Sequence, residues 1–221
     1  MHPEIYKNIY SNKNRKVFLN YLENNMELNS NILEVGPGPG LSTHLIKKYG
    51  KEITLIEPNK DYFEDLKRQF FHEKFKLYNG YLNESPIIKY DAIIMVFNVM
   101  NHISFDEINN FITNLKIRSK KNTKIYFDMY NSLGVKEIPP KEVFRDLGNE
   151  RILNICPSLK NNILKLTYKI DEKIIEEMNL YLHDLKELME KFLENGFNLQ
   201  KKDLLGRSGD SYFFEVYGFY G

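Results

Sequence analysis

Apolar positions along residues 32 to 127 follow two alternating spacings. Short continuous apolar runs, typical of strands buried on both faces, are separated by segments in which apolar residues recur at helical spacing. This alternation predicts βαβ units with right-handed crossovers and a mostly parallel sheet. The predicted strands are 32–35, 53–56, 75–78, 92–97 and 125–127, and the predicted helices are 41–49, 61–71 and 105–117.

The spacing differs on either side of this region. The N-terminal part shows an amphipathic helical pattern, whereas a segment rich in Pro, Gly and charge follows Asn131 and leads into three strand-like runs. A further helix and two closing strands end the chain. We therefore expect one domain, 1–221, with an N-terminal helical segment at 1–30 and a strand-rich insertion or lid at 132–182.

A glycine-rich turn follows the first predicted strand. The chain reads Glu34-Val-Gly-Pro-Gly-Pro-Gly40, and a helical run begins at Leu41. Glycine lets the backbone approach a ligand that a Cβ would block, and a strand, glycine turn and helix together form a nucleotide-binding element. A dinucleotide-binding turn would place its third glycine at position 41, and a Walker loop would continue with Gly-Lys-Ser/Thr. Neither pattern is present.

An acidic residue ends the second predicted strand. Glu57 lies about twenty residues beyond the glycine turn and is followed by Pro58. A carboxylate at this point can accept hydrogen bonds from both hydroxyls of a ribose. On its own, such an acid is more often a helix cap or a solvated residue. Together with the glycine turn, it indicates a nucleoside-binding site.

Two segments resemble a known family. The arrangement E-x-G-x-G-x-G, from Glu34 to Gly40, resembles motif I of the class I S-adenosylmethionine-dependent methyltransferases. The segment Phe97-Asn-Val-Met-Asn-His102 resembles motif IV of small-molecule members such as the dTDP-amino-sugar N,N-dimethyltransferases. The Asn/Asp-Pro-Pro-aromatic motif that DNA amino-methyltransferases carry at this point is absent.

This resemblance implies a fold and a cofactor. The fold is the Rossmann-like α/β methyltransferase fold, with a seven-stranded, mostly parallel sheet in the order 3-2-1-4-5-7-6 and a small antiparallel insertion after strand 5. The cofactor is S-adenosyl-L-methionine, and the product is S-adenosyl-L-homocysteine. The implied cofactor contacts, including the turn and Glu57, are Glu34, Gly36, Gly38, Gly40, Glu57, Pro58, Tyr81, Leu82, Phe97 and Asn98.

Three further residues are candidates for the chemistry. His102 follows the fourth strand and could act as a general base, or it could pack beside the methionine part of the cofactor. Asp128, at the end of the fifth strand, could orient the acceptor or cap a turn. Tyr10 matches loosely the tyrosines that close over the sulfonium in the relatives. Family members often have an acid where this chain has Tyr81, which could instead stack on the adenine.

Composition narrows the choice of partners and location. The 221 residues are 42% hydrophobic and 28% charged with a net charge of +1, so there is no overall field to attract nucleic acid or an acidic membrane. No apolar run approaches the roughly 18 residues of a membrane span. Cys156 is the one cysteine, which rules out an internal disulfide and fits a cytoplasmic location. Only Asp128 stands out as an acid beside the central strands, so no metal is expected.

These observations predict a methyltransferase that acts on an amino or hydroxyl group of a small molecule, a sugar or a cell-surface glycan precursor, with no nucleic-acid or membrane partner. Three alternatives stay open: an NAD(P)-dependent oxidoreductase, a non-catalytic nucleotide-binding regulatory protein, and an enzyme that modifies RNA. An exposed strand edge in the insertion would also favour pairing into a homodimer.

Overall fold

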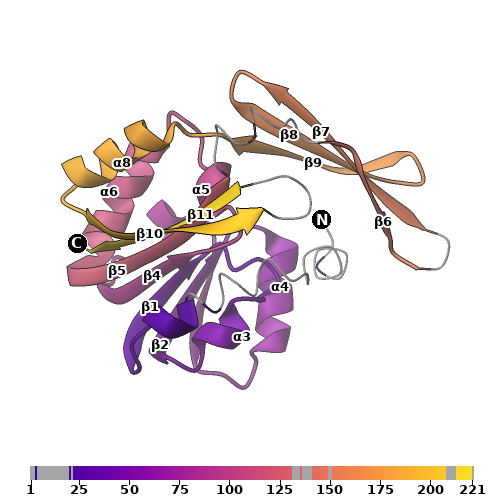
Figure 1. The fold of residues 1–221 in the computed structure, drawn as a ribbon. Coiled ribbons are helices and arrows are strands. Elements are labelled where there is room, and N and C mark those ends of the chain that lie inside the picture. The colour runs from indigo at the N-terminus through magenta and orange to yellow at the C-terminus, as the bar shows by residue number, and fades with distance from the viewer. Residues whose placement is uncertain are drawn as a thin grey trace.

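A computed structural model describes residues 22–130, 141–148, 151–207 and 213–220, together with the isolated positions 3, 20 and 135; beyond residue 198 it describes the backbone alone. The predicted alternation of strands and helices is present up to residue 130 (Figure 1). These elements are β1 (Ser30–Val35), α3 (Thr43–Ile46), β2 (Gly50–Glu57), α4 (Lys60–Gln69), β3 (Phe75–Asn79), β4 (Tyr90–Met95), α5 (Val99–His102), α6 (Ile108–Arg118) and β5 (Ser119–Tyr130).

The remaining elements form an insertion and a closing hairpin. Four antiparallel strands, β6 (Val143–Asp146), β7 (Ile152–Lys160), β8 (Ile163–Ile170) and β9 (Lys173–Tyr181), make a separate sheet in that order. They are followed by α8 (Leu185–Glu194), β10 (Asn198–Arg207) and β11 (Phe213–Tyr220). Figure 1 shows the small sheet projecting from the main body beyond the end of β5.

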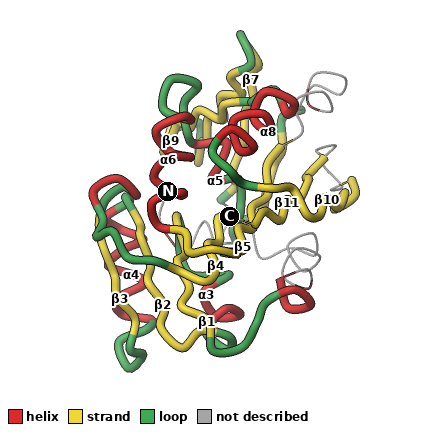
Figure 2. The backbone as a smooth tube through the Cα atoms, turned by 90° about the vertical axis from the view of Figure 1, so that its left-hand side faces the viewer, coloured by secondary structure: helices red, strands yellow, loops and turns green. Residues whose placement is uncertain are grey.

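The main sheet has seven strands in the order β3-β2-β1-β4-β5-β11-β10. The first five strands are parallel to one another, and β11 pairs antiparallel with β5. Figure 2 shows β3 and β10 at opposite ends of this sheet. The predicted fold is therefore confirmed, with its order 3-2-1-4-5-7-6, its antiparallel last strand and its small antiparallel sheet after strand 5.

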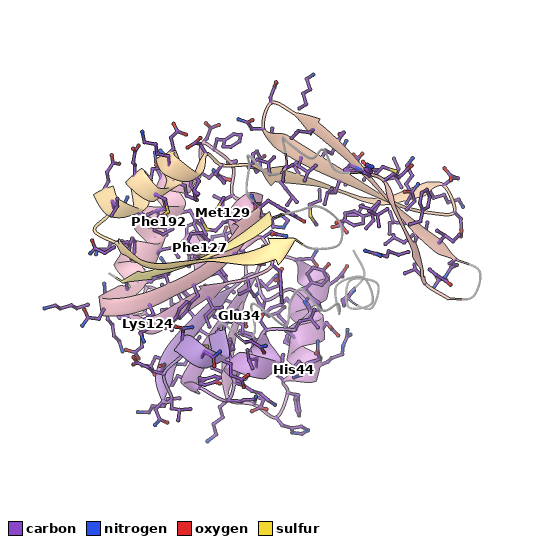
Figure 3. The ribbon with its side chains drawn as sticks, in the orientation of Figure 1. Glu34, His44, Lys124, Phe127, Met129 and Phe192 are labelled. Atoms are coloured by element: carbon purple, nitrogen blue, oxygen red, sulfur yellow. The ribbon has the colours of Figure 1, made fainter. Side chains whose placement is uncertain are left out.

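Alternate residues of each central strand pack on opposite faces of the sheet. In β1, Ile32 belongs to the cluster that contains Leu66 of α4, whereas Leu33 belongs to the cluster formed with α6 and α8. On the latter face Phe127 of β5 stacks on Phe192 of α8, with ring centroids 5.5 Å apart (Figure 3). Because both faces are covered by helices, the parallel strands need continuous apolar runs.

Two predicted helices are shorter than expected. The run at 41–49 forms only α3, and the run at 105–117 starts later, as α6, after the separate short helix α5. Among the described residues, no helix is long and apolar enough to cross a membrane.

Candidate active site

The glycine turn after β1 has a left-handed backbone at each glycine. The φ angles are +65° at Gly36, +55° at Gly38 and +81° at Gly40, which only glycine adopts readily. A Cβ on Gly36 would lie 2.9 Å from a methyl group of Val99, whereas a Cβ on Gly38 would meet no protein atom within 4 Å. Gly36 and Gly38 line a cavity of about 580 Å³. The space over Gly38 is therefore available to a ligand.

Three predicted cofactor contacts, Glu34, Gly40 and Asn98, do not line this cavity. Glu34 is fully buried, and its carboxylate accepts hydrogen bonds from the hydroxyls of Ser42 and Thr43 at the start of α3. Burial raises the pKa of Glu34 to about 7, and neighbouring Glu57 adds to the rise. A Cβ on Gly40 would lie 2.9 Å from the ring of Phe70, so this glycine allows α4 to pack closely. Neither Glu34 nor Gly40 lines the cavity.

Glu57, at the end of β2, lines the cavity beside the glycine turn. Its Oε2 accepts the Gly38 N–H at 2.8 Å and its Oε1 accepts the Asn59 N–H at 2.8 Å. The side chain is only 4% exposed, and burial raises its pKa to about 7 despite these two bonds. The carboxylate is thus held in one orientation, and it joins the end of β2 to the turn after β1. Pro58, the residue after it, also lines the cavity.

The segment after β3 forms the next part of the cavity wall. Gly80, Tyr81, Leu82 and Asn83 all line it. The Tyr81 side chain is 65% exposed, while Leu82 is buried. The Tyr81 backbone N–H donates to the carboxylate of Glu84 at 2.8 Å, which holds the turn in place. The stacking of Tyr81 on an adenine remains a prediction.

The turn after β4 is strained. Phe97 and Asn98 have φ angles of +64° and +66°, two consecutive left-handed residues that are not glycine. Such strain persists only where neighbouring groups hold it, and it is often found at functional sites. Here the carboxylate of Asp128 on β5, itself 4% exposed, accepts the Asn98 N–H at 3.0 Å. Asp128 does not line the cavity; its hydrogen bond holds the turn in place.

The Asn98 carboxamide carries an unsatisfied oxygen. Asn98 lies between Phe97 and Val99, both of which line the cavity, although Asn98 itself is not among the lining residues. Its Oδ1 is buried, and no group in the described part of the chain donates a hydrogen bond to it. A buried acceptor without a donor is costly, so a ligand that reached this oxygen with a donor would gain a hydrogen bond.

His102, at the end of α5, also lines the cavity. The imidazole is accessible from the cavity but lies deep among protein atoms, and this desolvation lowers its pKa to about 4. His102 is therefore neutral at pH 7 and would be a weak base. Tyr10, the third chemical candidate, lies outside the described residues.

The far wall of the cavity comes from the insertion. Residues Glu176–Asn179 of β9 face the cavity across from α5 and the start of α6, where Ile103 and Phe111 also line it. One half of the cavity thus surrounds the glycine turn, Glu57 and the turn after β3. The other half lies between the β4–α6 region and β9. The β9 residues were missed because nothing in a strand pattern shows which cavity a strand will border.

A family model described as ribosomal RNA adenine dimethylase matches residues 7–131, more than half of the chain. The chain belongs to this family. It is an S-adenosylmethionine-dependent methyltransferase, as the glycine turn and Glu57 predicted. The cavity half around these residues suits a nucleoside, and no atom of the described residues occupies the space over Gly38.

Individual relatives agree with the family. A ribosomal RNA small subunit methyltransferase A of Mycoplasmopsis pulmonis is 25% identical over 201 residues, which cover 84% of this chain and 75% of the relative. Among solved structures, an S-adenosylmethionine-dependent methyltransferase of Clostridium acetobutylicum has a TM-score of 0.81 at 15% identity, covering 98% of this chain and 96% of that one. An amino pentose methyltransferase of Micromonospora echinaspora has a TM-score of 0.70 at 11% identity, covering 97% and 94%. At these identities the solved structures support the fold alone.

The family overturns two predictions about the acceptor. The expected small-molecule acceptor, a sugar or glycan precursor, is wrong, and so is the expected absence of a nucleic-acid partner, because the family model and the relatives are named for methylation of ribosomal RNA. The error has a physical cause. A net charge near zero sums over the whole surface, whereas a nucleic acid is held by local contacts to phosphates and bases. The cytoplasmic location and a homodimer remain predictions.

Proposed function

We propose that this protein transfers methyl groups from S-adenosylmethionine to the exocyclic amino group of an adenine in RNA. The observation that carries the proposal is the buried Oδ1 of Asn98, which has no donor in the described part of the chain and lies in a strained turn at the cavity wall. The family match and the ribosomal RNA methyltransferase relatives support an RNA adenine as the acceptor.

An amino group on an adenine needs both orientation and activation. Its lone pair is delocalised into the ring, so the nitrogen must be held with the lone pair in line with the sulfonium methyl group. A hydrogen bond from this amino group to Asn98 Oδ1 would fix that direction. When the methyl group moves from sulfur to nitrogen, the nitrogen becomes cationic and releases one of its two hydrogens as a proton to solvent, so one N–H remains. The same acceptor can therefore hold the monomethylated base for a second transfer.

The acceptor half of the cavity suits a base taken out of its stack. Phe97, Ile103 and Phe111 give it flat or apolar walls, on which a nucleobase can pack. Unstacking a base costs a few kcal/mol, which such contacts can offset. The left-handed turn at Phe97 and Asn98 is held by Asp128 through the Asn98 N–H, so the backbone that carries the acceptor oxygen is fixed before the base enters.

The test is methylation of unmodified small-subunit ribosomal RNA, made by transcription, with S-adenosylmethionine. The RNA is digested to nucleosides, and methylated adenosines are measured by mass spectrometry. We expect monomethyl- and dimethyladenosine with the unaltered protein. In Asn98→Ala the rate should fall by at least about tenfold, the loss of one buried hydrogen bond to the acceptor, with unchanged S-adenosylmethionine binding.

Asn109→Ala is the matched control, since Asn109 is an exposed residue of α6 whose carboxamide oxygen accepts a bond from Lys191. The Asn109→Ala variant should methylate RNA at the rate of the unaltered protein. Absence of methylated adenosine with the unaltered protein, while S-adenosylmethionine still binds, would exclude this acceptor. Equal rates for Asn98→Ala and Asn109→Ala would exclude the assigned role of Asn98.

A further inference from the structure

Asn101 links the turn after β4 to both ends of the β6–β9 insertion. It lies on α5 and is fully buried. Its Oδ1 accepts the backbone N–H of Tyr130 at 2.8 Å, and its Nδ2 donates to the backbone carbonyl of Tyr181 at 2.8 Å. Tyr130 is the last residue of β5 and Tyr181 the last of β9. One carboxamide therefore joins the points where the chain enters and leaves the insertion.

This link lies between the two walls of the acceptor half. On one side, the Asn101 N–H donates to the carbonyl of Asn98 at 2.9 Å, and the next residue, His102, lines the cavity. On the other side, Glu176–Asn179 line the cavity from β9, which ends two residues later at Tyr181. Figure 1 shows α5 close to where the small sheet joins the main body. Asn101 is therefore bonded to the segments that carry both walls.

A second contact joins the same two segments. The ring Nε2 of His183, just after β9, lies 2.9 Å from the carbonyl oxygen of Ile103, just after α5. The ring of Phe105 also meets the rings of Tyr181 and His183 edge to face, with centroids 5.3 and 5.2 Å apart. These contacts can keep the insertion attached if the Asn101 link is weakened. Variants of Asn101 should therefore change the placement of the insertion and leave the fold intact.

The chemistry of the link requires a carboxamide. The Tyr130 N–H donates to Asn101, and the Tyr181 carbonyl accepts from Asn101 as well as from the His183 N–H at 3.2 Å. Asn supplies one acceptor and one donor at a short fixed spacing, so it can bond to both segments at once. A leucine of similar shape would fill the space but make neither bond. An ionised aspartate could accept from Tyr130 but could not donate to Tyr181. Packing alone does not explain an asparagine here; a connection between two backbone segments does.

We propose that Asn101 is a positioning residue for the acceptor: it sets the β9 wall against the turn that carries Asn98. This inference rests on the proposed function for the identity of the acceptor, but the link itself does not. Asn101 touches neither ligand, so it should affect the acceptor KM and the transfer rate while cofactor affinity stays the same. The cofactor half is bordered by the glycine turn after β1 and by Glu57 at the end of β2. Neither of them is part of the link.

The first test is the kinetics of Asn101→Asp between pH 6 and 8. At pH 8 the ionised carboxylate cannot donate to Tyr181, and we expect the acceptor KM to rise about tenfold, with S-adenosylmethionine affinity within twofold of normal. Burial raises the pKa of a carboxyl group, and the protonated acid can donate again. The acceptor KM should therefore recover as the pH falls to 6.

Controls separate this titration from others. The unaltered protein, measured over the same pH range, reports the remaining ionisable groups around the cavity and the link, which include Glu57, His102, Asp128, Tyr130, Glu176, Glu177, Tyr181 and His183. Burial lowers the pKa of both histidines, to about 4 for His102, so His102 is neutral throughout this range. Asn195→Asp is the matched control, because Asn195 Nδ2 donates to a backbone carbonyl, that of Lys191, at 2.9 Å at the end of α8. It should behave like the unaltered protein.

Hydrogen–deuterium exchange gives a readout that needs no acceptor. In Asn101→Asp at pH 8, amides of β9 and of Tyr130 should exchange faster than in the unaltered protein, while those of β1 to β3 should not. Unchanged exchange would refute the link, whatever the acceptor. Faster exchange with unchanged acceptor KM would refute the positioning role. If the unaltered protein methylates no RNA, the proposed function fails, and the exchange result decides the link by itself.

Discussion

Replacement of Glu57 by Gln would test the cofactor site most directly. The carboxylate accepts one hydrogen bond from Gly38 and one from Asn59. A carboxamide has one accepting oxygen, so its NH2 group would face one of these N–H donors, and it could not accept from both hydroxyls of a ribose. We expect weaker binding of S-adenosylmethionine by about 1–3 kcal/mol, roughly 5- to 150-fold.

The pKa of Glu57 also predicts that cofactor affinity depends on pH. With a pKa of about 7, the carboxyl group is about 10% ionised at pH 6 and about 90% ionised at pH 8. If the ionised form binds the ribose, cofactor affinity should rise by about an order of magnitude between these pH values. The Glu57→Gln variant should lose this dependence. Titration calorimetry with S-adenosylmethionine and S-adenosylhomocysteine at pH 6, 7 and 8 measures both effects.

The free energy of unfolding should change with pH in the opposite direction from the cofactor affinity. The folded-state pKa of Glu57 lies above its ordinary value of 4.5, so the folded protein holds this proton more tightly than the unfolded chain. The resulting stabilisation is present below about pH 4.5 and is lost as the pH rises through 7, by up to about 3 kcal/mol. Glu34 acts in the same direction. Thermal unfolding of Glu57→Gln without ligand should therefore depend less on pH than that of the unaltered protein, but not become independent of it.

Glu52→Gln is the matched control. Glu52 lies on the same strand, but it is exposed and pairs with Lys76 at 3.0 Å. It should leave cofactor affinity unchanged at every pH. Equal affinities and equal pH slopes for Glu57→Gln and the unaltered protein would refute the assignment of Glu57 to the ribose.

Two further predictions separate binding from packing. Gly38→Ala should weaken cofactor binding in calorimetry, since its Cβ enters the open space over the turn. Gly40→Ala, whose Cβ would press on Phe70, should lower the melting temperature and leave the cofactor affinity of the remaining folded protein near normal. The reverse pattern would contradict the assignment of Gly38 to binding and of Gly40 to packing. Phe192→Ala removes a fully buried ring stacked on Phe127 and should cost about 3–5 kcal/mol in urea unfolding. A loss below 1 kcal/mol would mean that this side of the core is not packed as described.

Much of the fold and part of the site follow from local features of the sequence. Continuous apolar runs identify the strands because a parallel sheet is buried on both faces. The glycines identify the turn because a left-handed backbone and close approach of a ligand exclude most other residues. Glu57 could be assigned to the nucleoside site because it lies at the carboxyl end of the second strand, at the same edge of the sheet as the glycine turn.

The acceptor site depends on contacts that no local pattern reveals. Asp128 holds the Asn98 turn from 30 residues away, and Asn101 reaches Tyr181 across 80 residues. Whether a polar side chain forms such a bond, caps a turn or faces solvent depends on which segments the fold brings within hydrogen-bond distance. The same holds for Glu176–Asn179, whose place in the cavity wall follows from the orientation of the small sheet.

The sequence by itself thus determined the strands and the glycine turn, because burial on both faces and a left-handed backbone each restrict the residues that can form them. Its resemblance to the class I methyltransferases supplied the strand order and the cofactor. Only the tertiary structure decided that Glu34 holds α3 instead of lining the cavity, that the Asn98 Oδ1 has no donor among the described residues, and that β9 forms the opposite wall. These features arise between segments far apart in the chain, and they form only when the packed core sets the distances between those segments.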